Sequence, residues 1–113
     1  ACEVARSKII LVLGHTRCGA VINACNDLRM GHFTGLLDKL KPAIEAETTV
    51  RENRSGENLE LVNKVCAIHV HQVIGQIRRQ SPIIRAKEES GEIMVAGGLY
   101  QIETGQVEFY TAV

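Results

Sequence analysis

The chain has 113 residues, with 13 lysines and arginines against 13 aspartates and glutamates. This length predicts one domain with a modest core, and the balanced charge gives no general attraction to nucleic acid or to an anionic membrane. No apolar run is long enough to cross a bilayer. The four cysteines are scattered, unlike those of a small secreted disulfide scaffold, which favours a reduced, cytoplasmic setting.

The first six residues, Ala1 to Arg6, carry no capping signal and are typical of the end of a helix that begins elsewhere. We therefore interpret residues 1–113 as a single α/β domain that is truncated at its N-terminus.

The first half of the chain alternates one apolar run with helical segments. In the segment 8–13, Lys8 is followed by five consecutive Ile, Leu and Val residues. Such a run is typical of a strand covered on both faces. Apolar spacing predicts a helix over 20–28 and another over 36–47, which Pro42 interrupts or kinks. Residues 48–56 are polar and predict a surface loop.

The second half predicts the longest helix, over 58–80, with Ser81-Pro82 as its stop and a short helix over 83–90 after it. The apolar stripe of the long helix is predicted to contain Leu59, Val62, Cys66, His69, Val70, Val73 and Ile77. A strand over 93–96 and a hairpin with arms at 99–102 and 107–110 close the chain.

These elements predict an α/β fold: a mostly parallel sheet flanked by helices, with a C-terminal hairpin. We expect the strand at 8–13 to run parallel to the strand at 93–96, because a long helix connects them. The helices at 20–28 and 58–80 are expected to cover these strands. We also expect an exposed sheet edge or apolar face wherever no partner chain covers it.

The candidate chemistry lies in the turn between the first strand and the first helix. His15 and Cys18 stand three residues apart there, and imidazole nitrogen and thiolate sulfur are both good zinc ligands. A helix that begins near Cys18 would favour its thiolate through the backbone N–H groups and the helix dipole. Taken alone, this spacing is weak evidence, and a turn histidine beside a buried or reactive cysteine is the simpler interpretation.

Three stretches together resemble the β-class carbonic anhydrases. The first is KIILVLGHTRCGAV at 8–21, where an apolar strand runs into Gly-His-x-x-Cys-Gly-Ala. The second, at 58–93, is similar to the family's long helix, its Ser-Pro stop and the short helix after it. The third, at 95–110, is similar to the closing strand and hairpin, although Gln101 replaces the family's usual aspartate. The resemblance implies that His15 and Cys18 are the second and third zinc ligands.

The first zinc ligand of that family is a cysteine in a C-x-D-x-R motif upstream of the histidine. No such motif precedes His15 in these residues, and Cys2 stands where the family has a helix. We therefore expect the cysteine, and the aspartate and arginine that accompany it, to lie upstream of Ala1. Two ligands hold zinc loosely, so the 113-residue chain alone is expected to be inactive.

The resemblance implies reversible, zinc-dependent hydration of CO2 to bicarbonate by the intact protein, and assembly into homodimers or higher homo-oligomers. Two alternatives stay open. One is a non-catalytic, carbonic-anhydrase-like binding or regulatory domain, such as one attached to an anion transporter. The other is a redox-sensitive thiol protein that uses Cys18.

The remaining histidines and cysteines have structural interpretations. We expect His69 in the core, His71 in solvent and His32 in a loop without a partner. The thiols of Cys25 and Cys66 are predicted to be core groups. Two further expectations are a solvated helix end at Arg78-Arg79 and a packing role for Tyr100.

Overall fold

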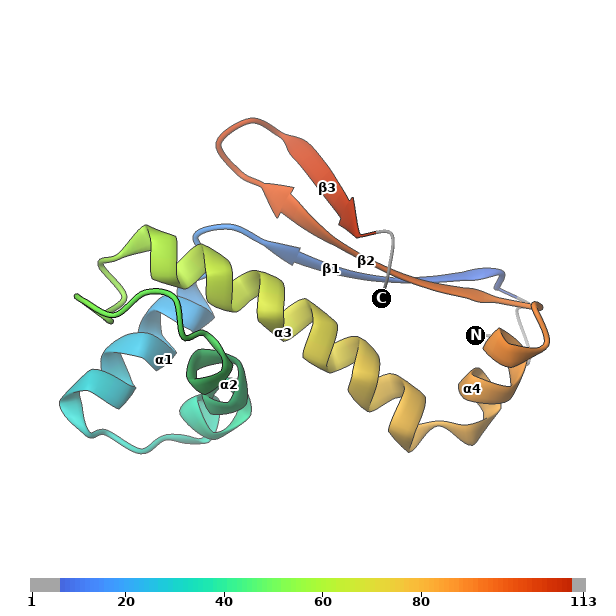
Figure 1. Cartoon of the computed structure of the whole chain (residues 1–113), viewed down its shortest axis with the longest axis horizontal. Coiled ribbons are helices and arrows are strands. Elements are labelled where there is room, and N and C mark those ends of the chain that lie inside the picture. Colours follow the sequence, from blue (N-terminus) through green and yellow to red (C-terminus); the bar gives the residue numbers. More distant parts are fainter. Residues whose placement is uncertain (1–6, 111–113) are drawn as a thin grey trace.

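A computed structural model describes residues 7–110, so the helix end expected at 1–6 lies outside the described residues. Figure 1 shows the order of the elements, which are β1 (Ile9–His15), α1 (Gly19–Met30), α2 (Gly35–Ala46), α3 (Leu59–Gln80), α4 (Pro82–Glu89), β2 (Met94–Gln101) and β3 (Gln106–Tyr110). The α/β class predicted from the sequence is confirmed.

The three strands form one sheet in the order β1-β2-β3. Strand β1 runs parallel to β2, as predicted. In the observed register Ile9 lies opposite Met94 and His15 opposite Tyr100. Strand β3 returns antiparallel to β2. The predicted strand at 93–96 and the first hairpin arm are one continuous strand, because the ladder runs through Gly97 and Gly98 without a break.

Helix α3 packs closely against one face of the sheet. A Cβ atom on Gly14 would come within 2.7 Å of Cγ2 of Val70, and one on Gly97 within 2.8 Å of Cδ1 of Ile74. Glycine at these positions therefore lets the helix approach the strands. The buried face of α3 differs in part from the predicted apolar stripe. Its buried residues are Leu61, Val62, Val65, Cys66, Val70 and Ile74.

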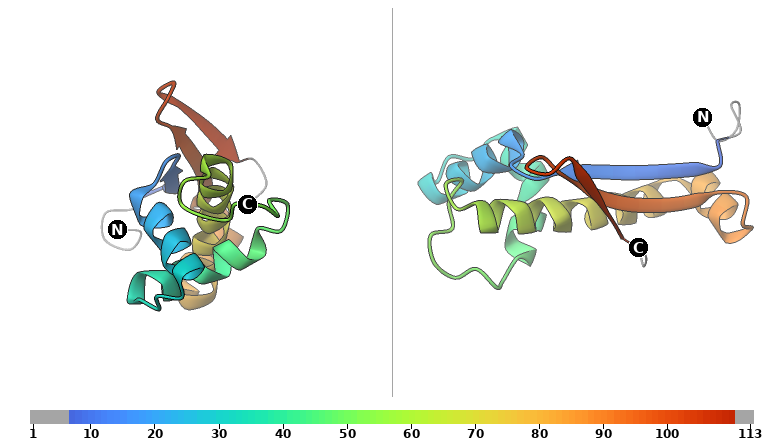
Figure 2. Two further views of the ribbon diagram at one scale, coloured as in Figure 1. Left: turned by 90° about the vertical axis from the view of Figure 1, so that its left-hand side faces the viewer. Right: turned by 90° about the horizontal axis from the view of Figure 1, so that it is seen from above.

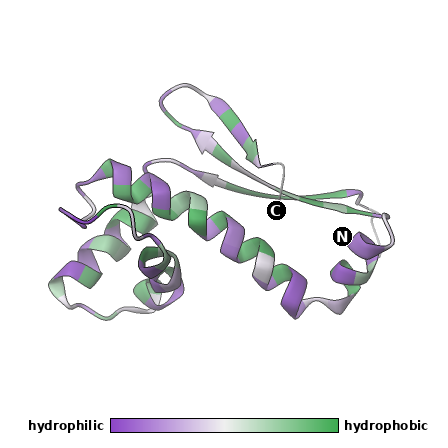
Figure 3. Ribbon diagram, viewed as in Figure 1, coloured by the Kyte–Doolittle hydropathy of each residue, from purple (hydrophilic) through white to green (hydrophobic). Residues whose placement is uncertain are grey.

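The opposite face of the sheet is open in the described part of the chain. Ile9, Leu11 and Leu13 of β1 are 61%, 45% and 50% exposed, and Met94 of β2 is 61% exposed. Figure 2 shows the helices on one side of the strands, and Figure 3 shows the hydrophobic colouring of β1. The predicted exposed apolar face is confirmed, whereas the interpretation of β1 as a strand covered on both faces is wrong for these residues.

Helix α1 packs against α2 and α3 rather than against the sheet, which corrects its predicted place. Thr34 caps the N-terminus of α2, since its hydroxyl accepts from the N–H of Leu37 at 3.1 Å, and the helix continues through Pro42 to Ala46. Together with α3 these helices enclose most of the buried apolar side chains. Within residues 7–110, none of the helices combines the length and apolar character that a membrane span requires.

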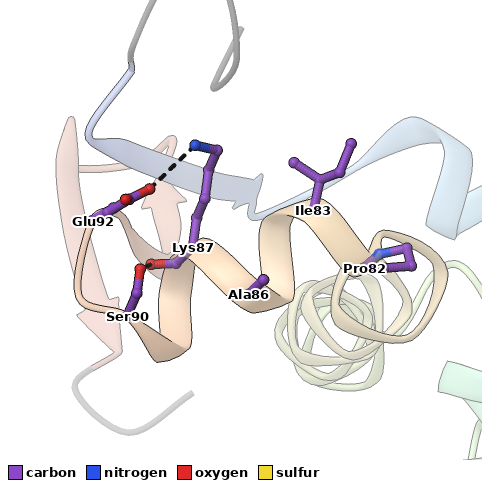
Figure 4. A pocket seen from close by; sticks show the side chains of 6 residues that line it. All are labelled: Pro82, Ile83, Ala86, Lys87, Ser90 and Glu92. Atoms are coloured by element: carbon purple, nitrogen blue, oxygen red, sulfur yellow. Dashed lines mark hydrogen bonds and ion pairs between the residues drawn. The ribbon is translucent and has the colours of Figure 1, made fainter.

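Helix α4 follows α3 after a single residue. Ser81 ends α3, and its hydroxyl accepts from the N–H of Ile84 to begin α4. Arg78 of α3 donates to both carboxylate oxygens of Glu88 in α4, at 2.8 and 2.7 Å, so it is not the solvated residue that the sequence predicted. Figure 4 shows the side chains that line a hollow along α4, where Lys87 pairs with Glu92 at 3.1 Å.

A buried carboxylate fixes the loop that follows α2. The side chain of Glu47 is 4% exposed, and it accepts from the hydroxyl of Thr49 at 2.6 Å, the N–H of Val50 at 2.9 Å and the guanidinium of Arg54 at 3.3 Å. Burial alone would raise the pKa of Glu47, but the hydrogen bonds from Thr49, Val50 and Arg54 outweigh it and lower the pKa to about 2.

We predict that Glu47 makes folding acid-sensitive. Its ordinary pKa of 4.5 falls to about 2 in the fold, so its contribution is complete above pH 4.5 and is lost as the pH falls toward 2. Glu47→Gln should reduce the free energy of unfolding at neutral pH by about 1–3 kcal/mol. It should also flatten the loss of stability below pH 4.5, as measured by urea unfolding across pH.

The matched control is Glu45→Gln, because Glu45 is 61% exposed and meets only Lys41, at 3.8 Å. This variant should follow the wild-type profile, since an exposed i,i+4 pair contributes little. Equal acid profiles for wild type and Glu47→Gln would contradict the role given to this carboxylate.

Candidate metal centre

His15 is the last residue of β1 and its ring is exposed at the C-terminal end of the strand. Its Nδ1 lies 2.9 Å from the carbonyl oxygen of Thr16. Because a carbonyl oxygen only accepts, this contact holds the ring proton on Nδ1 and leaves Nε2 with its lone pair. His15 is thus oriented as a metal-binding imidazole would be, with the second nitrogen fixed by a backbone hydrogen bond.

Cys18 is the N-cap residue of α1, with φ −65° and ψ 119°, and it makes no side-chain capping hydrogen bond. Its side chain is half-buried. The free N–H groups and the positive end of the α1 dipole lie at this terminus. His15 and Cys18 therefore stand on either side of one two-residue turn, as the sequence predicted; that they ligate an ion remains a prediction.

Successive turns of α3 contact the segment from Gly14 to Cys18. The amide oxygen of Asn63 accepts from the N–H of Arg17 at 2.9 Å, and Cys18 packs against the apolar cluster that contains Cys66. Val70 lies against Gly14. The contact with Asn63 holds Arg17 at φ 53°, a left-handed conformation that residues other than glycine adopt uncommonly.

Cys66 is a core thiol, as predicted. Burial raises its pKa to about 11; the N–H of Cys18 opposes this effect, and the neighbouring thiols of Cys18 and Cys25 add to it. The Cys66 thiol is therefore protonated at neutral pH and is a poor metal ligand in this state. Cys25 is also buried, and burial raises its pKa too.

A carboxylate from the C-terminal hairpin holds the same turn from the side. Glu103 accepts from the hydroxyl of buried Thr16 at 3.0 Å and from Nε of Arg17 at 2.7 Å. The hydroxyl of Thr16 also accepts from the N–H of Ile102 at 3.0 Å. Sequence analysis missed this contact, because Thr16 and Glu103 are 87 residues apart and no local pattern relates them.

The donor set fits zinc in kind but falls short in number. Imidazole nitrogen and cysteine sulfur are typical zinc ligands, yet a catalytic site supplies three protein ligands. Residues 7–110 contain no group of three or more His, Cys, Asp or Glu side chains arranged to hold an ion. The other histidines lie elsewhere: burial lowers the pKa of half-buried His69, exposed His71 lies 4.5 Å from the ring of Tyr110, and His32 is in a loop.

Comparison with known proteins identifies the family. The family model described as carbonic anhydrase matches residues 1–107. Carbonic anhydrase 2 of Mycobacterium tuberculosis is 28% identical over 111 residues, which are 94% of this chain and 50% of the relative. Carbonic anhydrase 1 of Escherichia coli O157:H7 is 28% identical over 104 residues, which are 90% of this chain and 46% of the relative. The chain belongs to the carbonic anhydrase family, in its β class.

Solved structures agree on the fold. The β-carbonic anhydrase CcaA superimposes with a TM-score of 0.71 at 20% identity, covering 96% of this chain and 50% of that one. A tetrameric β-carbonic anhydrase from Sordaria macrospora gives 0.73 at 22% identity, covering 98% and 56%. The chain thus spans about half the length of the curated relatives that it matches.

We predict that Glu103 orders the turn that carries His15 and Cys18. Glu103→Ala should speed amide hydrogen exchange at Thr16, Arg17 and Ile102 severalfold, because it removes the acceptor that Thr16 and Arg17 share. The control is Glu108→Ala, which removes a 3.4 Å contact with Gln101 on the exposed side of the hairpin and a charge near Tyr110, but no contact with Thr16 or Arg17. Unchanged exchange at Thr16 and Arg17 in Glu103→Ala would show that the turn is held without this carboxylate.

Proposed function

We propose that the whole protein is a zinc-dependent carbonic anhydrase that reversibly hydrates CO2 to bicarbonate. His15 and Cys18 are two of its three protein ligands in this proposal, and the third comes from outside the described residues. The observation that carries the proposal is the turn itself. In a chain of the carbonic anhydrase family, His15 ends a parallel strand and Cys18 caps the helix that follows two residues later. Histidine and cysteine are both common zinc ligands.

In this proposal His15 and Cys18 would bind the metal, and their neighbours would position them. When bound, zinc would lower the pKa of its water ligand to about 7 and so supply a nucleophilic hydroxide at neutral pH. His15 would present Nε2 to the metal, since Nδ1 is engaged by the carbonyl of Thr16. Cys18 would bind as a thiolate, helped by the N-terminus of α1. Thr16 and Arg17, which both bind Glu103, would keep His15 and Cys18 at a fixed separation.

The proposal extends to assembly and location. We propose a homodimer or a higher homo-oligomer in the cytoplasm. The exposed apolar face of β1 and the tetrameric relative from Sordaria macrospora support the first statement. The unpaired state of Cys18, Cys25 and Cys66 supports the second, because disulfides are rare in reducing compartments.

The decisive variants of the whole protein are His15→Ala and Cys18→Ser. Each should lower CO2 hydration at least about 100-fold and reduce the zinc content, because each removes a ligand that zinc needs. His32→Ala is the control, because His32 is exposed in a loop away from the turn. Full activity in Cys18→Ser would refute the ligand assignment. A wild-type protein without zinc would favour the non-catalytic binding domain instead.

A second prediction concerns the 113-residue chain by itself. It should hydrate CO2 at close to the uncatalysed rate and release zinc readily to a chelator, because the described residues offer an incomplete ligand set. The measurement is the hydration rate per equivalent of zinc for this chain and for the whole protein side by side. Tight, stoichiometric zinc and rapid turnover by the 113-residue chain would overturn the incomplete-site account.

A further inference from the structure

We propose that a hollow beside α1 binds a small organic carboxylate with a compact apolar body. The hollow has a volume of about 440 Å³ and lies between the C-terminal half of α1, the end of α2 and the loop after α2. Small-molecule sites typically have volumes of about 300–1,000 Å³. Nothing in the proposed carbonic anhydrase chemistry uses these residues.

The floor of the hollow is apolar. Cys25 and Ile44 line it and are each 2% exposed, and half-buried Leu28 lies beside them. These floor side chains are already out of water, so the favourable contribution comes from the apolar body of the ligand, which would leave water when it is placed on them. The floor therefore selects for a ligand that is more than a bare inorganic ion.

The rim of the hollow is positively charged. Arg29, Arg51 and Arg54 all line it. The buried carboxylate of Glu47 compensates Arg54. Arg29 donates only to the neutral amide of Asn53, at 3.2 Å, and Arg51 is exposed with no carboxylate partner among the described residues. Two guanidinium groups thus remain without a counter-ion, and guanidinium matches a carboxylate in shape and charge.

The walls are held in place before any ligand arrives. Arg54 donates to the carbonyl of Val50 at 2.6 Å and to that of Ile44 at 2.8 Å, which ties the loop to α2. The amide oxygen of Asn53 accepts from Arg29 and from the hydroxyl of Ser55, at 3.2 and 3.0 Å. A site that is already ordered binds a ligand with a smaller entropic cost.

Size and charge together define the ligand class. A water molecule occupies about 30 Å³ in the liquid, so bicarbonate or phosphate, each only a few times larger, would fill a small part of the hollow. The hollow on α4 in Figure 4 is of similar size, about 510 Å³, but its Lys87 already pairs with Glu92. That hollow lacks the uncompensated charge that a carboxylate needs and provides a contrast within the same chain.

The test is a titration of the chelator-treated 113-residue chain with sodium benzoate, followed by amide chemical shifts in two-dimensional NMR. Benzoate should cause saturable shifts within residues 25–29 and 51–54. Arg51→Ala should weaken binding at least about fivefold, since it removes one guanidinium partner of the carboxylate. Arg85→Ala is the control, because Arg85 is an exposed arginine of α4 and should leave binding unchanged. Arg54 is avoided because its loss would also break the Glu47 network.

Two outcomes would overturn the proposal. One is equal binding by wild type and Arg51→Ala, or shifts that never saturate. The other is binding of phosphate or bicarbonate as tight as that of benzoate, which would indicate an inorganic anion site. Because metal is removed from the sample, neither result depends on whether His15 and Cys18 bind zinc.

Discussion

The close packing of α3 on the sheet is the constraint on which the rest of the described structure depends. The helix approaches β1 and β2 over Gly14 and Gly97, where any larger side chain would collide with Val70 or Ile74. One face of α3 then continues past the end of β1. Asn63 accepts from the N–H of Arg17, Cys66 belongs to the cluster against which Cys18 packs, and Val70 lies against Gly14. These three residues of α3 stand at successive turns. The same helix therefore packs the core and positions the turn that carries the candidate ligands.

The hairpin adds a second support that is independent of α3. Glu103 reaches Thr16 and Arg17 from the end of β2, and the N–H of Thr16 donates to the carbonyl of Tyr100 at 2.9 Å. The turn between His15 and Cys18 is thus held by a helix on one side and by a hairpin on the other. Both supports act through backbone groups and neighbouring side chains, and none of the side-chain hydrogen bonds within the described residues engages Nε2 of His15. The half-buried Cys18 side chain packs against the edge of the apolar core.

Local patterns in the sequence predicted most of the fold and the two candidate ligands. The parallel pairing of β1 with β2 followed from two apolar runs joined by a long helix, and the Gly-His-x-x-Cys-Gly-Ala stretch located the turn. Local patterns did not predict features that depend on contacts between residues distant in the sequence. The Glu103 contact joins residues far apart in the chain. The strand predicted at 93–96 and the hairpin arm predicted at 99–102 are one strand, in which Gly97 is the contact with α3. The apolar run of β1 suggested burial on both faces, yet periodicity cannot show which neighbours are present.

The central claim is that His15 and Cys18 ligate zinc in the whole protein. Zinc K-edge X-ray absorption of the purified whole protein and of its Cys18→Ser variant tests this claim most directly. The account predicts a zinc shell with sulfur at about 2.3 Å and imidazole nitrogen at about 2.0 Å, from which Cys18→Ser removes one sulfur. An unchanged number of sulfur ligands in Cys18→Ser, or a shell without imidazole, would contradict it.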